Sequence, residues 1–150
     1  MESNSGEKDR SQHRLIERAQ QTSVPVAKLI GFTVEDVSDG RAVGLIEVDE
    51  RHANPMGTLH GGILCDVADA AMGMAFVSTL APEETFTTLE LRINFFRPFW
   101  KGLLKAKATV VNRGATVGFV ECAITDERDR LIAKASCSCM ALRGDRASNR

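Results

Sequence analysis

Two adjoining stretches of the chain decide the fold: Asn54-Pro-Met-Gly-Thr-Leu-His-Gly-Gly62, and the segment Ile63-Leu-Cys-Asp-Val-Ala-Asp-Ala-Ala-Met-Gly-Met-Ala-Phe-Val-Ser-Thr-Leu80 that follows it directly. The second stretch is rich in Ala and Met and is apolar around most of its circumference, which is typical of a buried helix. Its small residues would let a β-sheet approach the helix axis closely. Pro82 follows it and ends the helix. The sequence therefore predicts one long, buried central helix.

The segments on either side of this helix have the patterns of β-strands. Residues 88–95 alternate polar and apolar side chains at period two, which predicts that the apolar set, Leu89, Leu91, Ile93 and Phe95, faces the core. Strands begin at Phe32, after a short helix between Leu15 and Leu29 that Pro25 interrupts. Further strands are predicted at residues 41–48, 103–111, 116–125 and 131–142, and the short turns between the last three indicate antiparallel pairing. The pattern favours an α+β fold, in which an antiparallel sheet of about five to six strands wraps around the central helix.

The overall composition is that of an ordinary globular chain. Hydrophobic residues make up 43% and charged residues 26% of the 150 positions, which suits one compact domain. We expect a mobile leader over residues 1–13, a single domain over residues 14–142 and a frayed tail over residues 143–150. The net charge of −1 gives no electrostatic reason to expect nucleic-acid binding.

No segment has the features of a membrane span, an export signal or a metal site. Charges interrupt every apolar run before the roughly 20 residues that a membrane helix needs, and residues 1–14 lack the apolar core of a secretory signal. The sequence therefore predicts a cytoplasmic protein that does not contact membranes. Cys137 and Cys139 would share one face of a strand, but their spacing is not that of a zinc site. Together with Cys65 and Cys122 they are expected to be reduced, packed thiols, and no metal is expected.

The pair Gly61-Gly62 stands at the predicted start of the central helix. The N–H groups of a first helical turn have no intrahelical partner, and glycine lets a ligand come close to them. A thioester carbonyl placed there would be polarised by these donors and by the positive end of the helix dipole. A Gly-Gly pair can also be nothing more than a sharp turn before a helix. The preceding His60 is expected to position neighbouring groups by hydrogen bonding, with direct proton transfer as the alternative.

Two carboxylates, Asp66 and Asp69, interrupt the apolar helix at spacing i, i+3. Because burial of an unpaired carboxylate is costly, each must reach solvent, a partner or a substrate pocket, and a solvated seam is the simplest of these. A helix that begins near Gly61 places Asp69 about 12 Å from the N-terminal donors, at roughly 1.5 Å per residue. The two can act on one carbonyl carbon only if a second subunit packs antiparallel against the first. This reasoning predicts a two-fold dimer with two shared sites.

The pattern Asn54-x-x-Gly57-x-x-His60-Gly61-Gly62, followed by Asp69, resembles the hotdog-fold acyl-CoA thioesterases of the phenylacetate-pathway (PaaI-like) type, relatives of human thioesterase superfamily member 2. The resemblance extends from about Val26 to Leu142. It implies a hotdog fold, in which the long helix lies inside a curved antiparallel sheet. It also implies assembly into homodimers and usually into homotetramers.

The resemblance further implies which residues form the site. Asp69 would be the nucleophile or the general base, and Thr88 would hold the lytic water, both from one subunit. In the other subunit Asn54 would orient water and the carbonyl, the backbone N–H of Gly61 would supply the oxyanion hole, with Gly62 next to it, and His60 would hydrogen-bond nearby. Coenzyme A is part of the substrate, so no separate cofactor is expected.

Coenzyme A carries phosphates, so the resemblance also implies a basic rim. The turn Arg113-Gly114-Ala115-Thr116 would lie near the pantetheine and the nucleotide, and Arg97 is a second candidate. An ordinary solvated turn is the alternative interpretation of the same residues.

These features together predict hydrolysis of an aryl- or fatty-acyl-CoA thioester to the free acid and coenzyme A. One alternative is a hotdog hydratase acting on enoyl or hydroxyacyl thioesters, but that subclass typically uses a His together with an acid, and no second suitably placed His is evident. Another alternative is a non-catalytic acyl-CoA-binding protein, although no helix-turn-helix precedes the strands and Asp69 is present. Release of free thiol would distinguish catalysis from binding.

Overall fold

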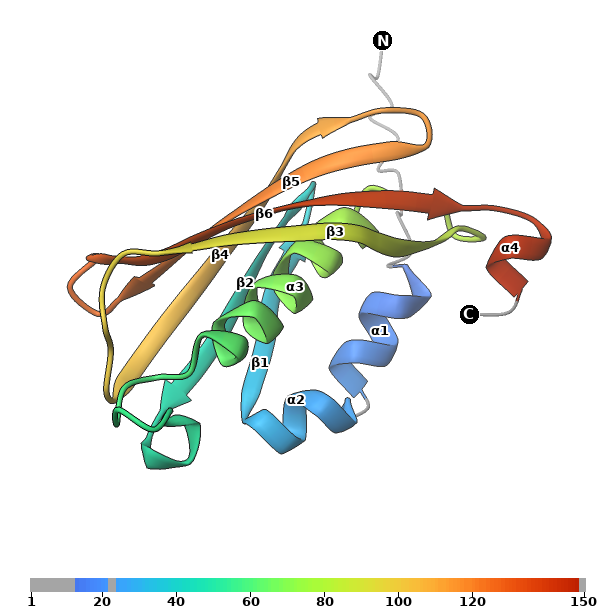
Figure 1. Ribbon diagram of the computed structural model, residues 1–150. Helices are drawn as coiled ribbons and strands as arrows, with labels where there is room; N and C mark the ends of the chain where they lie inside the picture. The colour runs from blue at the N-terminus through green and yellow to red at the C-terminus, as the bar shows by residue number, and fades with distance from the viewer. Residues whose placement is uncertain (1–12, 22–23, 149–150) are drawn as a thin grey trace, which may run out of the picture.

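The computed structural model describes residues 13–21 and 24–148, and shows one curved sheet wrapped around one long helix (Figure 1). The elements in chain order are α1 (Arg14–Gln21), α2 (Pro25–Ile30), β1 (Phe32–Ser38), β2 (Arg41–Val48), the 3-10 turn η1 (Glu50–His52), α3 (Gly61–Val77), β3 (Thr85–Phe95), β4 (Gly102–Arg113), β5 (Val117–Asp126), β6 (Leu131–Leu142) and α4 (Asp145–Ser148). The strand order is β1-β2-β4-β5-β6-β3, and all neighbours are antiparallel. The predicted α+β fold, with a central helix and six strands, is confirmed.

The central helix α3 packs against the concave face of the sheet, and small residues make this close approach possible. A Cβ atom on Gly73 would lie 2.9 Å from Cζ of Phe86 in β3, and a Cβ atom on Gly44 in β2 would lie 3.1 Å from Cγ1 of Val67. A larger side chain at either position would force Phe86 or Val67 to shift. These glycines therefore allow β3 and β2 to pack close to α3.

Strand β3 forms one edge of the sheet and pairs only with β6 among the described strands. The prediction that four of its apolar residues face the core is wrong for Leu89 and Phe95, which are 53% and 54% exposed. Leu91 and Ile93 do pack against the core. The register with β6 shifts between Thr88 and Glu90, and such a bulge re-aims the side chain next to it, which is Leu89. Phe95 lies at the end of the strand, beside the first turn of α3.

Both ends of the described chain are bound to one buried acid, Glu84. Nε2 of His13 lies 3.1 Å from the backbone oxygen of Glu84, and Arg143 forms an ion pair with its carboxylate. The structure therefore differs from the expected leader at His13 and from the expected tail over residues 143–148, where α4 forms and Ala147 is buried. A buried carboxylate requires cationic and hydrogen-bonding partners, and Arg143 supplies one of them, whereas His13 contacts the backbone of Glu84. Residues 1–12 and 149–150 of those predictions lie outside the described residues.

Two smaller features concern the helices and the cysteines. Pro25 begins α2, a position that suits proline because its missing N–H would have no partner there. Among the described residues no helix is long and apolar enough to cross a membrane. All four cysteines are free thiols; Cys65 is half-buried and the other three are buried.

Candidate active site

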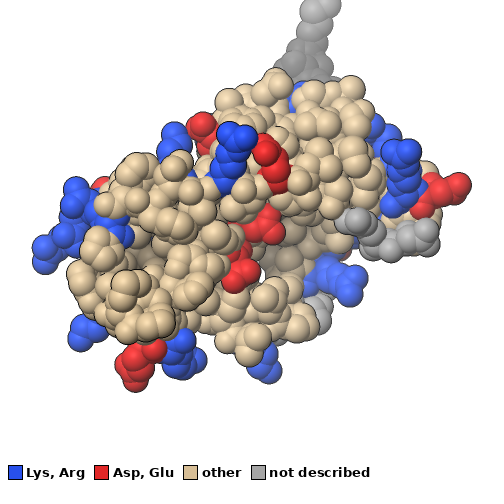
Figure 2. Space-filling view, in the orientation of Figure 1, with Lys and Arg blue, Asp and Glu red and all other residues tan. Residues whose placement is uncertain are grey.

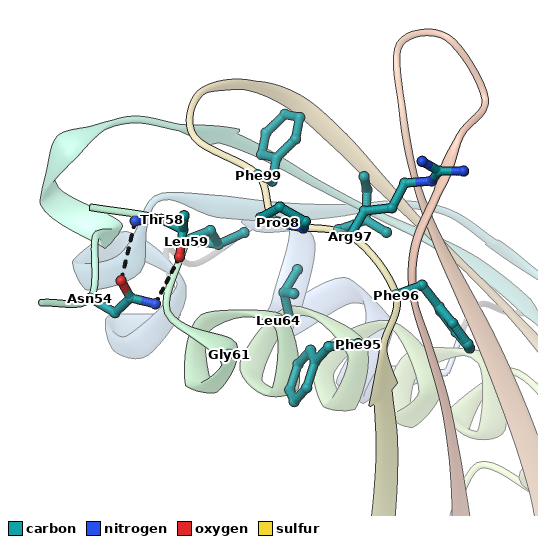
Figure 3. A pocket seen from close by; sticks show the side chains of 11 residues that line it. Asn54, Thr58, Leu59, Gly61, Leu64, Phe95, Phe96, Arg97, Pro98 and Phe99 are labelled. Carbon is teal, nitrogen blue, oxygen red and sulfur yellow. Dashed lines mark hydrogen bonds between the residues drawn. The ribbon is translucent and has the colours of Figure 1, made fainter. Parts of the chain in front are cut away.

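The loop before α3 is shaped by the side chain of Asn54. Its Oδ1 accepts hydrogen bonds from the backbone N–H groups of Met56 (3.0 Å) and Thr58 (3.1 Å), and its Nδ2 donates to Oγ1 of Thr58 (2.9 Å). Figure 3 shows the amide turned into this loop. Gly57 completes the turn in the left-handed region, with φ of 83°. Asn54 therefore keeps at most one N–H for a ligand, and its main visible effect is to hold the loop that leads to Gly61.

His60 is the N-cap of α3. Its backbone is extended, and its Nδ1 accepts the backbone N–H of Gly62 at 2.9 Å. Nδ1 therefore carries no hydrogen in this arrangement, and it caps the first turn of the helix. The N–H of Gly61 has no hydrogen-bond partner among residues 13–21 and 24–148. Of the two N–H groups predicted to polarise a carbonyl, only that of Gly61 is available.

A hollow of about 370 Å³ lies beside Gly61 and is lined mostly by apolar side chains (Figure 3). Its lining residues are Asn54, Thr58, Leu59, Gly61, Leu64, Phe95, Phe96, Arg97, Pro98, Phe99 and Ile132. The ring of Phe95 lies so close to Gly61 that a Cβ atom there would be 2.8 Å from Cζ. Arg97 is exposed at the rim, and its guanidinium makes no ion pair with any described residue. The hollow thus combines an open N–H donor with an unpaired cation.

The two predicted residues Asp69 and Thr88 meet on the open side of α3. The Thr88 hydroxyl donates to Oδ1 of Asp69 at 3.1 Å, and Asp69 is exposed. A second hollow lies beside Asp69, and its lining includes Thr88 and the neighbouring Asp66. Burial together with the charge of Asp69 raises the pKa of Asp66. Figure 2 shows acidic side chains in the hollowed middle of this face, with most Lys and Arg side chains toward its rims. A carboxylate that faces a hollow and is oriented by a hydroxyl can act as a base or a nucleophile.

Within one chain these two groups of residues stay apart. Gly61 begins α3 and Asp69 lies eight positions further along, so about 12 Å of helix separates them. The hollow beside Gly61 and the hollow beside Asp69 have no lining residue in common. The structure therefore agrees with the distance argument drawn from the sequence.

The turn predicted to bind coenzyme A lies at the opposite end of α3 from Arg97. Nε of Arg113 donates to Oγ1 of Thr79 at 3.0 Å, its guanidinium lies 4.8 Å from the centre of the Phe76 ring, and its Nη2 is 3.9 Å from Glu84. The N–H of Gly114 donates to the carbonyl of Val117 (2.9 Å), and the carbonyl of Thr116 accepts the N–H of Ala141 (2.7 Å). Most polar groups of this turn are thus occupied by the protein itself. In one chain the turn and Arg97 are not brought together.

Two features of the structure were not predicted from the sequence. Cys139 lies directly opposite Thr88 in the β3–β6 pairing. The only signal for this was the alternation of Cys137 and Cys139 along one strand. Glu84 binds both chain ends, and no local pattern indicates that. The described residues contain no group of three or more His, Cys, Asp or Glu side chains that could hold a metal ion.

Both the sequence and the structure of this chain are similar to those of known proteins. Residues 56–133 match the family model described as the thioesterase superfamily. A 1,4-dihydroxy-2-naphthoyl-CoA hydrolase of Listeria monocytogenes is 31% identical over 109 residues, which cover 73% of this chain and 89% of that protein. The structure of the PaaI protein from the phenylacetic acid degradation operon of E. coli has a TM-score of 0.77 at 25% identity and covers 85% of this chain and 91% of that one. A thioesterase of Haemophilus influenzae has the same fold, with a TM-score of 0.80 at 22% identity over 89% of this chain and 93% of that one.

Proposed function

This chain belongs to the thioesterase superfamily and is a thioester hydrolase, and we propose that its substrate is an aryl- or fatty-acyl-CoA thioester, which it hydrolyses to the free acid and coenzyme A. The observation that carries the proposal is the Asp69–Thr88 pair on the open side of an otherwise apolar helix. The name of the Listeria relative supports a coenzyme A ester as the substrate class.

The reaction follows from the chemistry of these groups. Asp69 either activates a water molecule or attacks the thioester carbonyl directly, while Thr88 orients its carboxylate through the 3.1 Å hydrogen bond. The N–H of Gly61 stabilises the oxyanion that forms as the carbonyl carbon becomes tetrahedral. The C–S bond then breaks, and the coenzyme A thiolate leaves and takes up a proton. If water attacks, its oxygen ends directly in the free acid; if Asp69 attacks, the acyl group is first held as an anhydride on its carboxylate, which water then hydrolyses to the free acid and Asp69. No cofactor takes part in this scheme.

The site requires a second subunit, and β3 is the element that we expect to meet it. Its outer edge is unpaired among the described strands, it is 11 residues long, and Leu89 and Phe95 on it are more than half exposed. A long, apolar, unpaired edge favours pairing with another strand. Antiparallel pairing of two β3 strands about a two-fold axis would bring Gly61 of each subunit toward Asp69 of the other. We extend this to a cytoplasmic homotetramer made of two such dimers.

Arg97 is our candidate for the coenzyme A phosphates. Arg97 is one of the residues that line the hollow beside Gly61, and its exposed guanidinium forms no ion pair among the described residues, so it is available to an anionic substrate. Arg113 is less suited in a single chain because Thr79 and the Phe76 ring already hold it. In an antiparallel dimer, the Arg113 turn of the partner subunit could still close over the nucleotide.

Thiol release tests the proposal. We would measure free thiol from a panel of aryl- and fatty-acyl-CoA esters with the wild type, Asp69→Ala and Asp66→Ala at equal folded concentration. Asp66 is the matched control, because it is an acid on the same helix and lines the same hollow. We expect activity in the wild type, at least a 100-fold loss in Asp69→Ala and a loss below threefold in Asp66→Ala. Binding of esters without thiol release in the wild type would favour a non-catalytic binding protein instead.

A further inference from the structure

Strand β3 carries two opposite charges near the middle of its length. The side chains of Arg92 and Glu90 are 79% and 53% exposed, and Nε of Arg92 lies 3.7 Å from Oε2 of Glu90. Leu91 between them packs against the core, so both charges lie on the convex face of the sheet, opposite α3. Among the described strands β3 pairs only with β6, which leaves its other edge open beside these charges. An ion pair as exposed as this one adds little to the stability of a single chain.

The two charges decide how two copies of this edge can pair about a two-fold axis. Symmetric antiparallel pairing sets one residue of β3 opposite the same residue of the partner subunit, and residues equally far from it on its two sides face each other. An axis at Glu90 sets two carboxylates against each other, and an axis at Arg92 sets two guanidinium groups against each other. An axis at Leu91 sets Glu90 of each subunit opposite Arg92 of the other. Only the axis at Leu91 makes both charges attractive across the edge.

The central helix gives the position of the axis by an independent argument. A shared site needs Gly61 of each subunit opposite Asp69 of the other, so the axis crosses α3 midway between them, at Cys65. These three residues are spaced i, i+4 and i+8 and lie along one face of the helix. Cys65 and Leu91 line the same hollow, together with Asp69. The axis required by the charges and the axis required by the site therefore pass beside the same hollow.

We propose that β3 recognises a second copy of this chain by its charges: Glu90 and Arg92 form ion pairs with Arg92 and Glu90 of the partner subunit, about a two-fold axis at Leu91. The inference rests on the proposed function, because it takes the site to be shared between two subunits. Moving the axis by one residue in either direction sets like charges opposite each other and is disfavoured. The charges thus select the register that brings the two halves of the site together. The plain alternative is an ion pair that acts only within one chain.

Two charge reversals test this recognition. In homodimers of Glu90→Lys, and equally of Arg92→Glu, both facing pairs become repulsive, whereas a dimer with one copy of each variant has both pairs matched. The two variants, one of them with a mass tag, would be unfolded, refolded together in equal amounts and counted by native mass spectrometry. Random pairing, as between tagged and untagged wild type, gives one half heterodimers. We expect about three quarters or more, which corresponds to at least a tenfold shift of the exchange equilibrium.

A second ion pair on the sheet provides a matched control. Nζ of Lys134 in β6 lies 3.5 Å from Oε2 of Glu121 in β5, and the two side chains are 51% and 43% exposed. Both strands lie inside the sheet, away from the β3 edge. Glu121→Lys and Lys134→Glu change the net charge as the β3 variants do, and their mixture should give one half heterodimers. Equal enrichment in both mixtures would show that net charge drives pairing, and one half heterodimers in both would show that the β3 charges do not face each other. Either result overturns the proposal.

The double variant Glu90→Lys/Arg92→Glu tests the register itself. It restores both facing pairs in its own homodimer but sets like charges opposite each other when it pairs with wild type. We expect heterodimers with wild type to fall to about a quarter or less. An axis at Glu90 or at Arg92 would instead enrich them. An ion pair that acts only within one chain would leave them at one half, because the double variant keeps that pair. Enrichment or one half would thus overturn the register.

Thiol release by the same samples separates this inference from the proposed function. Mass counting reports the pairing whether or not the protein is active. We expect homodimers of the double variant to keep kcat within about threefold of the wild type, because their register is unchanged. Selective pairing as expected, with no thiol release by the wild type, would contradict the proposed function and support the register. Full thiol release by a wild type that stays monomeric would overturn the register and keep the hydrolase.

Discussion

Helix α3 and the segment that follows it hold their acidic residues in opposite circumstances. Beyond its C-terminal end, Glu84 is 6% exposed, and its carboxylate accepts the N–H of Ala81 and binds Arg143, with Arg113 3.9 Å away. In the middle of α3, Asp69 is exposed and accepts a hydrogen bond from the Thr88 hydroxyl. No cation in the described chain forms an ion pair with Asp69.

The difference separates charges that hold the fold from charges that are available to a substrate. The Glu84 carboxylate is satisfied by the protein, so its removal should affect stability. Asp69 faces a hollow, and among the described residues its carboxylate is oriented by the Thr88 hydroxyl. The N–H of Gly61 has no acceptor among the described residues. Substitutions of Asp69 or Gly61 should therefore affect catalysis.

The largest effect is expected at the N-terminal end, from Gly61→Val. A Cβ atom there would lie 2.8 Å from the Phe95 ring, so the ring or the first turn must shift, and the valine side chain crowds the space beside the N–H where the carbonyl would lie. We expect kcat to fall about 100-fold or more, as it does when one oxyanion donor is lost. The measurement is thiol release at saturating ester, with thermal unfolding as the control for folding. A valine variant with wild-type kcat would show that the Gly61 N–H takes no part.

At the other end, Glu84→Gln should destabilise the protein by about 2 kcal/mol at pH 7, because Arg143 and Arg113 lose their anion. Activity per folded molecule should remain within about twofold. Urea unfolding gives the stability, and thiol release at equal folded concentration gives the activity. If Glu84→Gln were as stable as the wild type but had lost activity, the assignment of Glu84 to stability would be contradicted.

The same variant has a pH signature. Burial opposes ionisation of Glu84, but the Ala81 N–H, Arg143 and Arg113 outweigh it and lower the pKa from its ordinary value of 4.5. A carboxyl with a lowered folded-state pKa stabilises the fold above its unfolded pKa, and this contribution is lost as the pH falls through the folded value. The stability difference between wild type and Glu84→Gln should thus be full at pH 7 and should shrink below about pH 4.5.

The two arginines sharpen the comparison further. Arg97→Gln should raise KM for coenzyme A esters about five- to tenfold with little change in Tm, since its guanidinium is exposed and unpaired among the described residues. Arg113→Gln should instead lower Tm, because Thr79, Glu84 and the Phe76 ring lose their partner. A short pantetheine thioester without the nucleotide serves as the control substrate. If the wild type and Arg97→Gln have the same KM for the complete coenzyme A ester, Arg97 does not contact the phosphates of the substrate.

The smallest effect is expected from Asp66→Asn. Burial and the nearby Asp69 raise the pKa of Asp66, and a raised folded-state pKa costs stability above the unfolded value. The residue is exposed, so solvent screens most of this cost, and the gain at pH 7 should be about 0.3 kcal/mol. The gain should vanish as the pH falls below the unfolded pKa of an aspartate. Urea unfolding at pH 7 and pH 3.5 measures both, and a loss of stability at pH 7 would contradict the assignment.

The sequence predicted correctly those helices and strands whose formation depends on residues close together in the chain. The central helix, observed over Gly61–Val77, follows from its apolar, alanine-rich composition. The strands Arg41–Val48 and Leu131–Leu142 have the predicted bounds. Asp69 and Thr88 were each selected as site residues from a family resemblance, whereas the hydrogen bond between them is a finding of the structure.

Long-range pairing explains what the sequence did not show. The alternation in β3 could not reveal that the strand is an edge with a bulge, so Leu89 was wrongly placed in the core. Glu84 binds Arg143 across 59 residues, and no periodic pattern encodes such a contact. For the same reason the chain ends at His13 and Arg143 were expected to be mobile. The partners of Arg113 depend on how α3 and the β4–β5 turn pack together.

The central claim is that one catalytic site is built from two subunits, and mixing two inactive variants tests it directly. Asp69→Asn and Gly61→Val would be unfolded together, refolded at equal amounts and assayed for thiol release. A hybrid dimer contains one site with both Asp69 and Gly61 intact, so random pairing should restore about a quarter of the wild-type rate. A mixture that stays as inactive as its separate components, with hybrid dimers confirmed by mass, would contradict a site shared between subunits.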